Sequence, residues 1–357
     1  CSSTNMSSTI PSTMRAVGFY AHLPIDDPAS LVDLNVPVPN IAGHDLLVHV
    51  KAVSVNPVDY KLRAPNGQGP LNSPKILGYD AAGVVVAVGP DVTRFSVGDE
   101  VYYAGTWQRN GTNAEYHAVD ERIVGRKPTS LSFADAAALP LTSITAWEAL
   151  FHRLGVPTTT TTAPKTNKPV SILILNGAGG VGSIAIQLAK QLTDLTVIAS
   201  ASRPESQVWV KDLGADHVVN HRHDIVSQLA AIGVPKVDYI LVFTDLPPYF
   251  DAIVEVVKPQ GKICAIASFT DNLPFQKLFA KSVTFSWEMM FTRVVFNTDD
   301  IAEQYHLLNQ VSVLVDTKRL RSTTNQSLGA INASNLKQAH ATLEAGTVMG
   351  KLVLSGF

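Results

Sequence analysis

The feature that most constrains this chain is a glycine-rich turn between a buried apolar run and a helical pattern. The run Ile172–Leu175 has the length and composition of a fully buried parallel strand. Gly177, Gly179 and Gly182 follow in a G-x-G-x-x-G spacing, and a helical pattern continues to Lys190. Such a turn directs free N–H groups and a helix dipole at one spot, and glycines let a pyrophosphate approach the backbone. The segment predicts a dinucleotide site, with a plain tight turn as the alternative.

Bulk properties narrow the class of protein. The chain has 357 residues, more than one compact core usually holds, so we expect two domains. A net charge of −2 gives no electrostatic reason to expect nucleic acid or an anionic membrane as partner. No apolar run reaches the roughly 20 residues of a membrane span. Two cysteines, Cys1 and Cys264, fit a cytoplasmic, reducing compartment, and the Ser/Thr-rich residues 1–13 are expected to form a flexible leader.

The order of patterns predicts how the domains are connected. Residues 14–140 carry short alternating runs broken by Gly, Pro and Asp, which indicates strands and loops of a barrel-type domain. Apolar spacing in 133–155 turns helical, and the prolyl, polar residues 157–169 are expected to form a solvent loop. Further strands are predicted at 171–176, 195–199, 217–220, 237–243, 261–268 and 282–287, and helices at about 180–192, 204–213, 224–232 and 247–258.

This alternation predicts an α/β fold with a doubly wound parallel sheet. A further helix at 299–315 and a short tail strand at 350–354 follow it. We therefore predict a β-rich catalytic domain made of residues 14–145 and 299–357, into which a nucleotide-binding domain, residues 146–298, is inserted.

Several separated motifs in this order resemble the medium-chain dehydrogenase/reductase superfamily from Met14 to Phe357. Within it, the chain is similar to the quinone oxidoreductase (zeta-crystallin-like) branch and to the group labelled zinc-type alcohol dehydrogenase-like. The resemblance implies a GroES-like barrel domain, a Rossmann domain, an active site in the cleft between them and a homodimer. The matching segments are Asn56–Asp59, Gly78–Gly83, Gly98–Val101, Leu139–Pro140, Thr145–Trp147 and Gly177–Lys190.

The family's metal positions predict that this chain holds no metal. Its zinc enzymes place a cysteine, a histidine and a second cysteine or acid around the catalytic zinc. The matching residues here are Asn56, Tyr79 and, at about the third position, Leu141. An amide, a phenol and a hydrocarbon do not make a tetrahedral N/S site, and two cysteines cannot build the family's four-cysteine structural site. Without a Lewis acid, hydride addition to a quinone or a conjugated C=C is easier than to an isolated carbonyl.

The end of the second Rossmann strand predicts the cofactor NADPH. An acid about 20 residues after the glycines would bind the ribose 2′-hydroxyl of NADH. Here Ser202 and Arg203 stand in that region, and the first acid is Glu205. A hydroxyl and a guanidinium suit a 2′-phosphate, whereas a solvated surface arginine is the alternative. Quinone reductases usually carry a tyrosine beside that phosphate, and this chain has His221 instead.

Other cofactor contacts follow from the resemblance and from the rule that ligands collect at the carboxyl ends of parallel strands. The resemblance brings the tail residue Lys351 to the cofactor, with an edge-strand lysine as a nearly equal alternative. The predicted cofactor-binding residues are Thr142, Thr145, Gly177, Gly179, Gly180, Val181, Gly182, Ser202, Arg203, His221, Phe243, Thr244, Ala267, Ser268, Phe269 and Lys351.

Lys61 is the predicted proton donor or oxyanion holder. It stands five residues after Asn56, as in the alkenal/enone reductases and fungal trans-acting enoyl reductases that this stretch resembles. A lysine over the cleft could bind the substrate oxygen, with a surface lysine as the alternative. Asn56 is expected to anchor a carboxamide or the substrate oxygen, and Tyr79 to donate a hydrogen bond or pack in the core. Predicted substrate-pocket residues are Tyr60, Trp287 and Phe291.

These observations predict an NADPH-dependent reductase of quinones or α,β-unsaturated carbonyls, with a small molecule as substrate. A trans-acting enoyl reductase of a polyketide pathway is a close alternative, although no docking patch for a carrier protein is evident. A crystallin-like or RNA-binding protein that retains the fold is a different class. The near-neutral charge and the lack of an Arg/Lys cluster argue against RNA.

Overall fold

The computed structural model describes residues 10–159 and 169–357. Residues 1–9 of the predicted leader, Cys1 included, and residues 160–168 of the predicted solvent loop lie outside this part. No helix in the described residues is both long and apolar enough to cross a membrane.

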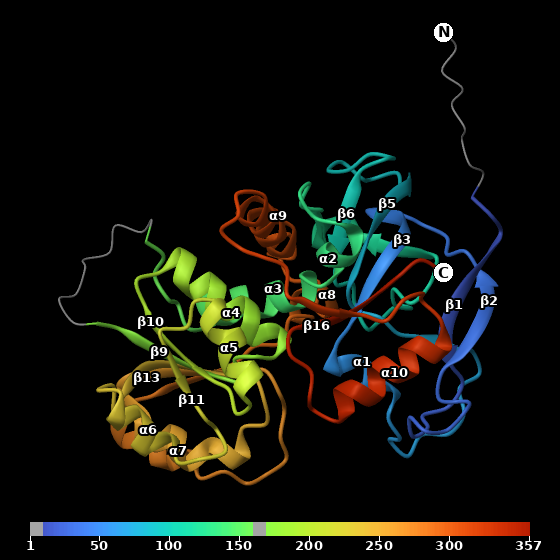
Figure 1. Cartoon of the computed structure of the whole chain (residues 1–357). Helices are drawn as coiled ribbons and strands as arrows, with labels where there is room; N and C mark the ends of the chain where they lie inside the picture. Colours follow the sequence, from blue (N-terminus) through green and yellow to red (C-terminus); the bar gives the residue numbers. More distant parts are fainter. Residues whose placement is uncertain (1–9, 160–168) are drawn as a thin grey trace.

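The first half of the chain forms a β-rich unit with a few short helices, which is completed by two C-terminal strands, β15 (Thr324–Ser327) and β16 (Lys351–Ser355) (Figure 1). A seven-stranded sheet has the order β15-β16-β3-β5-β6-β8, and β7 pairs with β3 outside that path. A smaller sheet has the order β2-β1-β4. The strands and helices of this half are β1 (Thr13–Phe19), β2 (Val32–Pro37), β3 (Asp45–Val55), α1 (Pro57–Arg63), β4 (Lys75–Ile76), β5 (Ala81–Val88), β6 (Glu100–Tyr103), β7 (Tyr116–Asp120), the 3₁₀-helix η1 (Glu121–Ile123) and β8 (Val124–Arg126).

Helices α2 (Phe133–Ala137) and α3 (Pro140–Trp147) connect this unit to the second one, and the π-helical segment η2 (Glu148–Arg153) directly continues α3. Every residue of α3 is buried, because the helix packs on α4 (Gly180–Leu192) and α9 (Glu303–Asp316) and lies between the two units. One apolar core accordingly extends from β3 and β5 through α3 to α4.

The second unit is an open six-stranded parallel sheet of order β11-β10-β9-β12-β13-β14. Figure 1 shows helices on both of its faces. This confirms the predicted doubly wound α/β architecture. Its elements are β9 (Ser171–Leu175), α4 (Gly180–Leu192), β10 (Thr196–Ser200), α5 (Pro204–Asp212), β11 (His217–Val219), α6 (Ile225–Ala231), β12 (Val237–Val242), η3 (Pro247–Tyr249), α7 (Phe250–Val256), β13 (Val257–Ala265), η4 (Phe275–Lys281) and β14 (Thr284–Trp287).

One predicted boundary is wrong. The helix expected over 247–258 ends at Val256, and β13 begins at Val257 rather than at 261. Pro259 explains the early end, because a proline disfavours the helical conformation of the residue before it.

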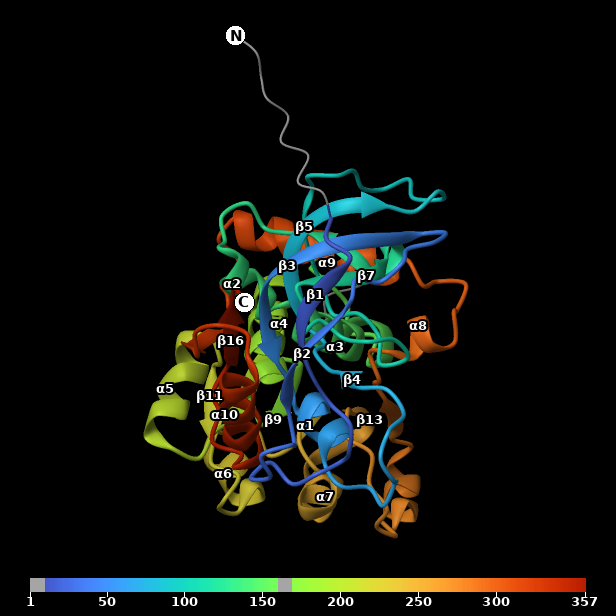
Figure 2. The same cartoon turned by 90° about the vertical axis from the view of Figure 1, so that its right-hand side faces the viewer.

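The C-terminal segment returns to the first unit, as Figures 1 and 2 show in red. Its tail strand pairs antiparallel with β3, and α10 packs against α1. The elements are α8 (Thr292–Val295), α9 (Glu303–Asp316), β15 (Thr324–Ser327), α10 (Ala333–Glu344) and β16 (Lys351–Ser355). Just before β16, the Gly350 N–H donates to Ala178 O at 2.9 Å, so the tail also contacts the glycine-rich turn. The domain limits 145/146 and 298/299 stay predictions.

Candidate active site

A cavity of about 790 Å³ lies between the two units, at the carboxyl ends of the parallel strands. Its size is that of a small-molecule or cofactor site, and its position is where ligands of open α/β sheets collect. The cavity brings together many of the predicted residues: Asn56, Tyr60, Lys61, Thr142, Thr145, Gly179, Gly180, Val181, His221, Phe243, Thr244, Ala267, Ser268, Phe291 and Lys351.

The remaining predicted residues do not line the cavity: they are Tyr79, Gly177, Gly182, Ser202, Arg203, Phe269 and Trp287. Tyr79 is fully buried, and its ring packs edge-on against Phe291, which does line the cavity. Its hydroxyl has no hydrogen-bond partner within the described residues, and burial raises its pKa well above the ordinary value. Phe269 packs against Trp287 outside the cavity.

The glycine-rich turn packs closely against its surroundings and leads directly into α4. A Cβ on Gly182 would lie 2.3 Å from Asn176 O, and one on Gly180 would lie 2.9 Å from Lys351 Cδ. The backbone is therefore closely packed at the start of α4, a helix of 13 residues whose N-terminus faces the cavity. Free N–H groups at such a helix start bind phosphate groups. These residues fit the diphosphate of a dinucleotide.

The predicted 2′-phosphate residues lie beside the cavity. Arg203 donates from Nη2 to Thr347 O at 2.8 Å, and its Nε lies 3.1 Å from a Glu205 carboxylate oxygen. The ring of His221 lines the cavity edge-on to Tyr249, and burial lowers its pKa. Arg203 thus links the second unit to the loop before β16. A phosphate that bound its guanidinium would have to replace the contacts with Thr347 and Glu205.

A buried polar network occupies the centre of the first unit's cavity wall. The Lys351 ammonium donates to Val55 O at 3.0 Å, to Asp80 Oδ2 at 3.0 Å and to Asn56 Oδ1. Asn56 Nδ2 donates to the same Asp80 oxygen at 2.7 Å, and Leu141 N–H donates to the other at 2.7 Å. An ammonium has three donors, and all three are taken. The network therefore fixes Asn56 and Lys351 by bonds within the protein.

Asp59 supports this network from the start of α1. It accepts the Asn56 N–H at 2.7 Å and the Gly78 N–H at 2.9 Å, which joins two loops of the first unit. Burial raises the pKa of Asp59 to about 7, although both hydrogen bonds act in the opposite direction. The position of the Asn56 backbone is thus set by Asp59, and that of its amide by Asp80.

These residues do not fit a catalytic zinc. Asn56 is bonded to an ammonium and a carboxylate, Tyr79 offers a phenol whose pKa is raised by burial, and Leu141 offers only hydrocarbon. A second cation beside the Lys351 ammonium would be repelled within the dry interior. In residues 10–159 and 169–357 no three His, Cys, Asp or Glu side chains are grouped so that they could hold a metal ion.

Lys61 differs from the buried Lys351, because its side chain is exposed and borders the cavity. Within the described chain, no carboxylate or carbonyl is hydrogen-bonded to its ammonium, which leaves its donors available to a ligand. Tyr60 lines the same wall half-buried, and burial raises its pKa.

Sequence reasoning assigned no role to several residues that shape the site. Asp80 anchors the buried network, Trp107 packs at 4.8 Å from the Phe291 ring, and Glu288 borders the cavity. A signal existed for Asp80, because a lone carboxylate within an otherwise apolar stretch needs a buried partner. No local pattern marks Trp107 as part of the site.

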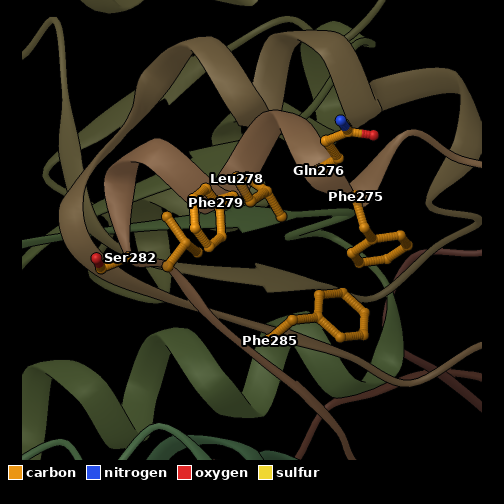
Figure 3. A pocket seen from close by; sticks show the side chains of 7 residues that line it. Phe275, Gln276, Leu278, Phe279, Ser282 and Phe285 are labelled. Carbon is orange, nitrogen blue, oxygen red and sulfur yellow. The ribbon is translucent and has the colours of Figure 1, made fainter.

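A second hollow, of about 600 Å³, lies elsewhere, between η4 and the edge strand β14 (Figure 3). Phe275, Leu278, Phe279 and Phe285 line it, and none of its residues borders the cavity described above. It carries no charged side chain, so it offers an apolar surface rather than a reaction site.

Comparisons with known proteins agree with this architecture. Residues 42–129 match the alcohol dehydrogenase GroES-like domain, and residues 180–310 match the zinc-binding dehydrogenase family. The zinc-type alcohol dehydrogenase-like protein of Staphylococcus epidermidis is 39% identical over 343 residues, which cover 96% of this chain and 99% of that protein. The chain belongs to the medium-chain dehydrogenase/reductase superfamily. As a member it is an oxidoreductase, and it falls in the zinc-type alcohol dehydrogenase-like group.

Other superfamily members differ in their described activities. The 2-methylene-furan-3-one reductase of Solanum lycopersicum is 31% identical over 98% of this chain and 81% of its own length. A Rhizobium etli CFN 42 protein described as a zinc-dependent alcohol dehydrogenase is 53% identical, with a TM-score of 0.91 and coverage of 98% and 99%. The quinone oxidoreductase of Coxiella burnetii is 29% identical, with a TM-score of 0.78 and coverage of 97% and 100%.

Proposed function

We propose that this protein reduces quinones or α,β-unsaturated carbonyls with NADPH and without zinc. The observation that carries the proposal is the Lys351–Asn56–Asp80 network, in which Asn56, the residue at one of the family's metal-ligand positions, is bonded to an ammonium and a carboxylate. An acceptor that is already electron-poor needs no Lewis acid. The named activities of the tomato and Coxiella relatives are of this kind.

When bound, the dihydronicotinamide supplies a hydride. The chain's own part is to orient the reactants and to stabilise the oxyanion that forms on the substrate. The Lys61 ammonium borders the cavity with free donors, so it can hold that oxygen and deliver a proton to the product. Thr142 and Thr145 form the facing wall from α3, where their hydroxyls donate to carbonyls of their own helix.

The preference for NADPH over NADH is proposed on Arg203. Its guanidinium lies beside the cavity, held by one carbonyl and one exposed carboxylate that a 2′-phosphate can replace. Glu205 weakens this preference, because its carboxylate would repel the phosphate while Arg203 attracts it.

We also propose a cytoplasmic homodimer that forms through the edge of the parallel sheet. Strand β14 ends that sheet, and the neighbouring Phe279 is 87% exposed and Trp287 46% exposed. An open edge strand with apolar side chains beside it is suited to pairing with a second copy. Light scattering at several concentrations tests this, and Phe279→Glu is expected to give monomers.

The experiment that tests the function is NADPH oxidation with a benzoquinone, a phenanthrenequinone and an alkenone, each measured on dialysed enzyme. Turnover of quinones or enones that is insensitive to chelator supports the proposal. Absence of turnover with all three acceptors, or brisk chelator-sensitive alcohol oxidation, contradicts it.

A further inference from the structure

Two buried carboxyl groups face each other behind the wall of the cavity. Glu148 begins the π-helical segment η2, and Glu288 directly follows β14; they are 1% and 2% exposed. Arg153 joins them, because its guanidinium contacts a carboxylate oxygen of each. Glu148 is three residues after Thr145, one helical turn along from the cavity, and Glu288 itself borders the cavity ahead of Met289.

Arginines and other titratable side chains lie on the elements that pack against this pair. Arg293 of α8 contacts Glu148 Oε1 at 2.6 Å, and Arg153 contacts Glu288 Oε2 at 2.7 Å and Glu148 Oε2 at 3.7 Å. Asp300 binds the far side of Arg293 at 3.0 Å. The other titratable groups nearby are His152, whose pKa burial lowers, Glu303, and Cys264 on β13, whose thiol pKa burial raises to about 12.

Three carboxyl groups share two guanidiniums here, because Asp300 competes with Glu148 for Arg293. Glu148, Glu288 and Asp300 carry three negative charges when ionised, whereas Arg153 and Arg293 carry two positive ones. Two carboxylates in contact within a dry interior do not both ionise. The hydrogen bonds agree, because within the described residues no N–H or O–H donates a hydrogen bond to Glu288 Oε1 or to either carboxylate oxygen of Glu148. A proton on Glu148 supplies that missing donor, and burial together with the neighbouring carboxylate raises its pKa.

We propose that Glu148 and Glu288 share one proton, and that this hydrogen bond is a positioning device that holds α3 against the Met289–Phe291 wall of the cavity. The inference goes beyond the proposed reaction, because it concerns the shape of the site before any substrate binds. Loss of the proton at alkaline pH leaves two carboxylates that repel each other across this joint. The two walls then separate, and the affinity for a nucleotide falls.

The first test is the pH dependence of unfolding without cofactor, in the wild type and in Glu148→Gln. The folded state keeps a proton that the unfolded chain releases above about pH 4.3, so this pair loses stability as pH rises from there to its raised pKa. The wild-type unfolding constant should therefore rise by up to about tenfold per pH unit relative to the variant, which has an amide donor and no proton to lose. Parallel curves for the two proteins would overturn the shared proton.

The second test is the binding of NADPH, followed by fluorescence across the same pH range. The wild type is expected to lose affinity at least about threefold on the alkaline side, and Glu148→Gln to keep it. Glu288→Gln should behave likewise and serves if the first variant does not fold. If Glu148→Gln flattens the pH dependence of unfolding, but the pH dependence of NADPH affinity is the same in the variant and the wild type, the positioning role is overturned. Both tests are independent of quinone or enone turnover, so their failure is distinct from failure of the proposed function.

Discussion

Replacing Lys351 by methionine tests the buried network directly. The side chain keeps its apolar stem, which packs against Gly180, but the ammonium that serves Val55, Asn56 and Asp80 is removed. The Asp80 carboxylate then remains in the interior without its counter-charge. Removing one partner of a buried ion pair in this way is strongly destabilising, whereas removing both partners together is much less so.

The magnitude follows from the geometry. At the 3.0 Å that separates Lys351 Nζ from Asp80 Oδ2, the attraction is about 5–6 kcal/mol at an effective dielectric constant of about 20. Desolvation of both charges offsets part of this, so we expect Lys351→Met to lower the free energy of unfolding by about 3–5 kcal/mol. Asp80→Asn leaves an unpaired ammonium at a similar cost. The double variant should lose about 1–3 kcal/mol less stability than the sum of the losses in the two single variants.

Urea unfolding followed by tryptophan fluorescence and circular dichroism measures all four proteins. The matched control is Lys277→Met, which breaks a lysine–aspartate pair of 2.7 Å whose side chains are 51% and 82% exposed. That variant should change stability by less than about 1 kcal/mol. A loss below about 1 kcal/mol for Lys351→Met, or simple additivity with Asp80→Asn, would refute the reasoning.

Three further outcomes are expected. Arg203→Ala should raise the Kd for NADPH about 10- to 100-fold and leave that for NADH nearly unchanged, measured by fluorescence titration; equal effects on both would remove Arg203 from 2′-phosphate recognition. Lys61→Ala should lower kcat with enones or quinones at least about tenfold in a protein with an unchanged unfolding midpoint, and an unchanged kcat would make solvent the proton source. Gly182→Ala should abolish NADPH binding and destabilise the fold, because its Cβ would lie 2.3 Å from Asn176 O, whereas Gly69→Ala, which meets nothing within 4 Å, should be silent in both assays.

The parallel-sheet unit was predictable because its signals are local. The strand before Gly177, the glycines themselves and the helix after them form one continuous stretch, and their spacing dictates the structure. The one misplaced boundary, at Val257, reflects a competition between a helical pattern and a proline two residues later, which local periodicity does not rank.

The candidate site was predictable as a region but not in its internal bonds. Strand ends such as Phe243–Thr244 line the cavity because the topology of a parallel sheet places them there. The partner of Lys351 is Asp80, 271 residues away in the chain, and no pattern in either segment records the pairing. Glu148 and Glu288 were missed for the same reason, since each is an ordinary glutamate until the fold brings them together.

The proposed chemistry depends on a site that is closed by an ammonium and not by a metal, and one measurement tests this most directly. Purified enzyme is dialysed against a strong chelator, assayed for its metal content, and its NADPH-dependent turnover of an alkenone and a benzoquinone is compared before and after treatment. The account predicts a metal-free protein with the same turnover in both samples. Stoichiometric zinc whose removal abolishes turnover, and whose return restores it, would contradict the account.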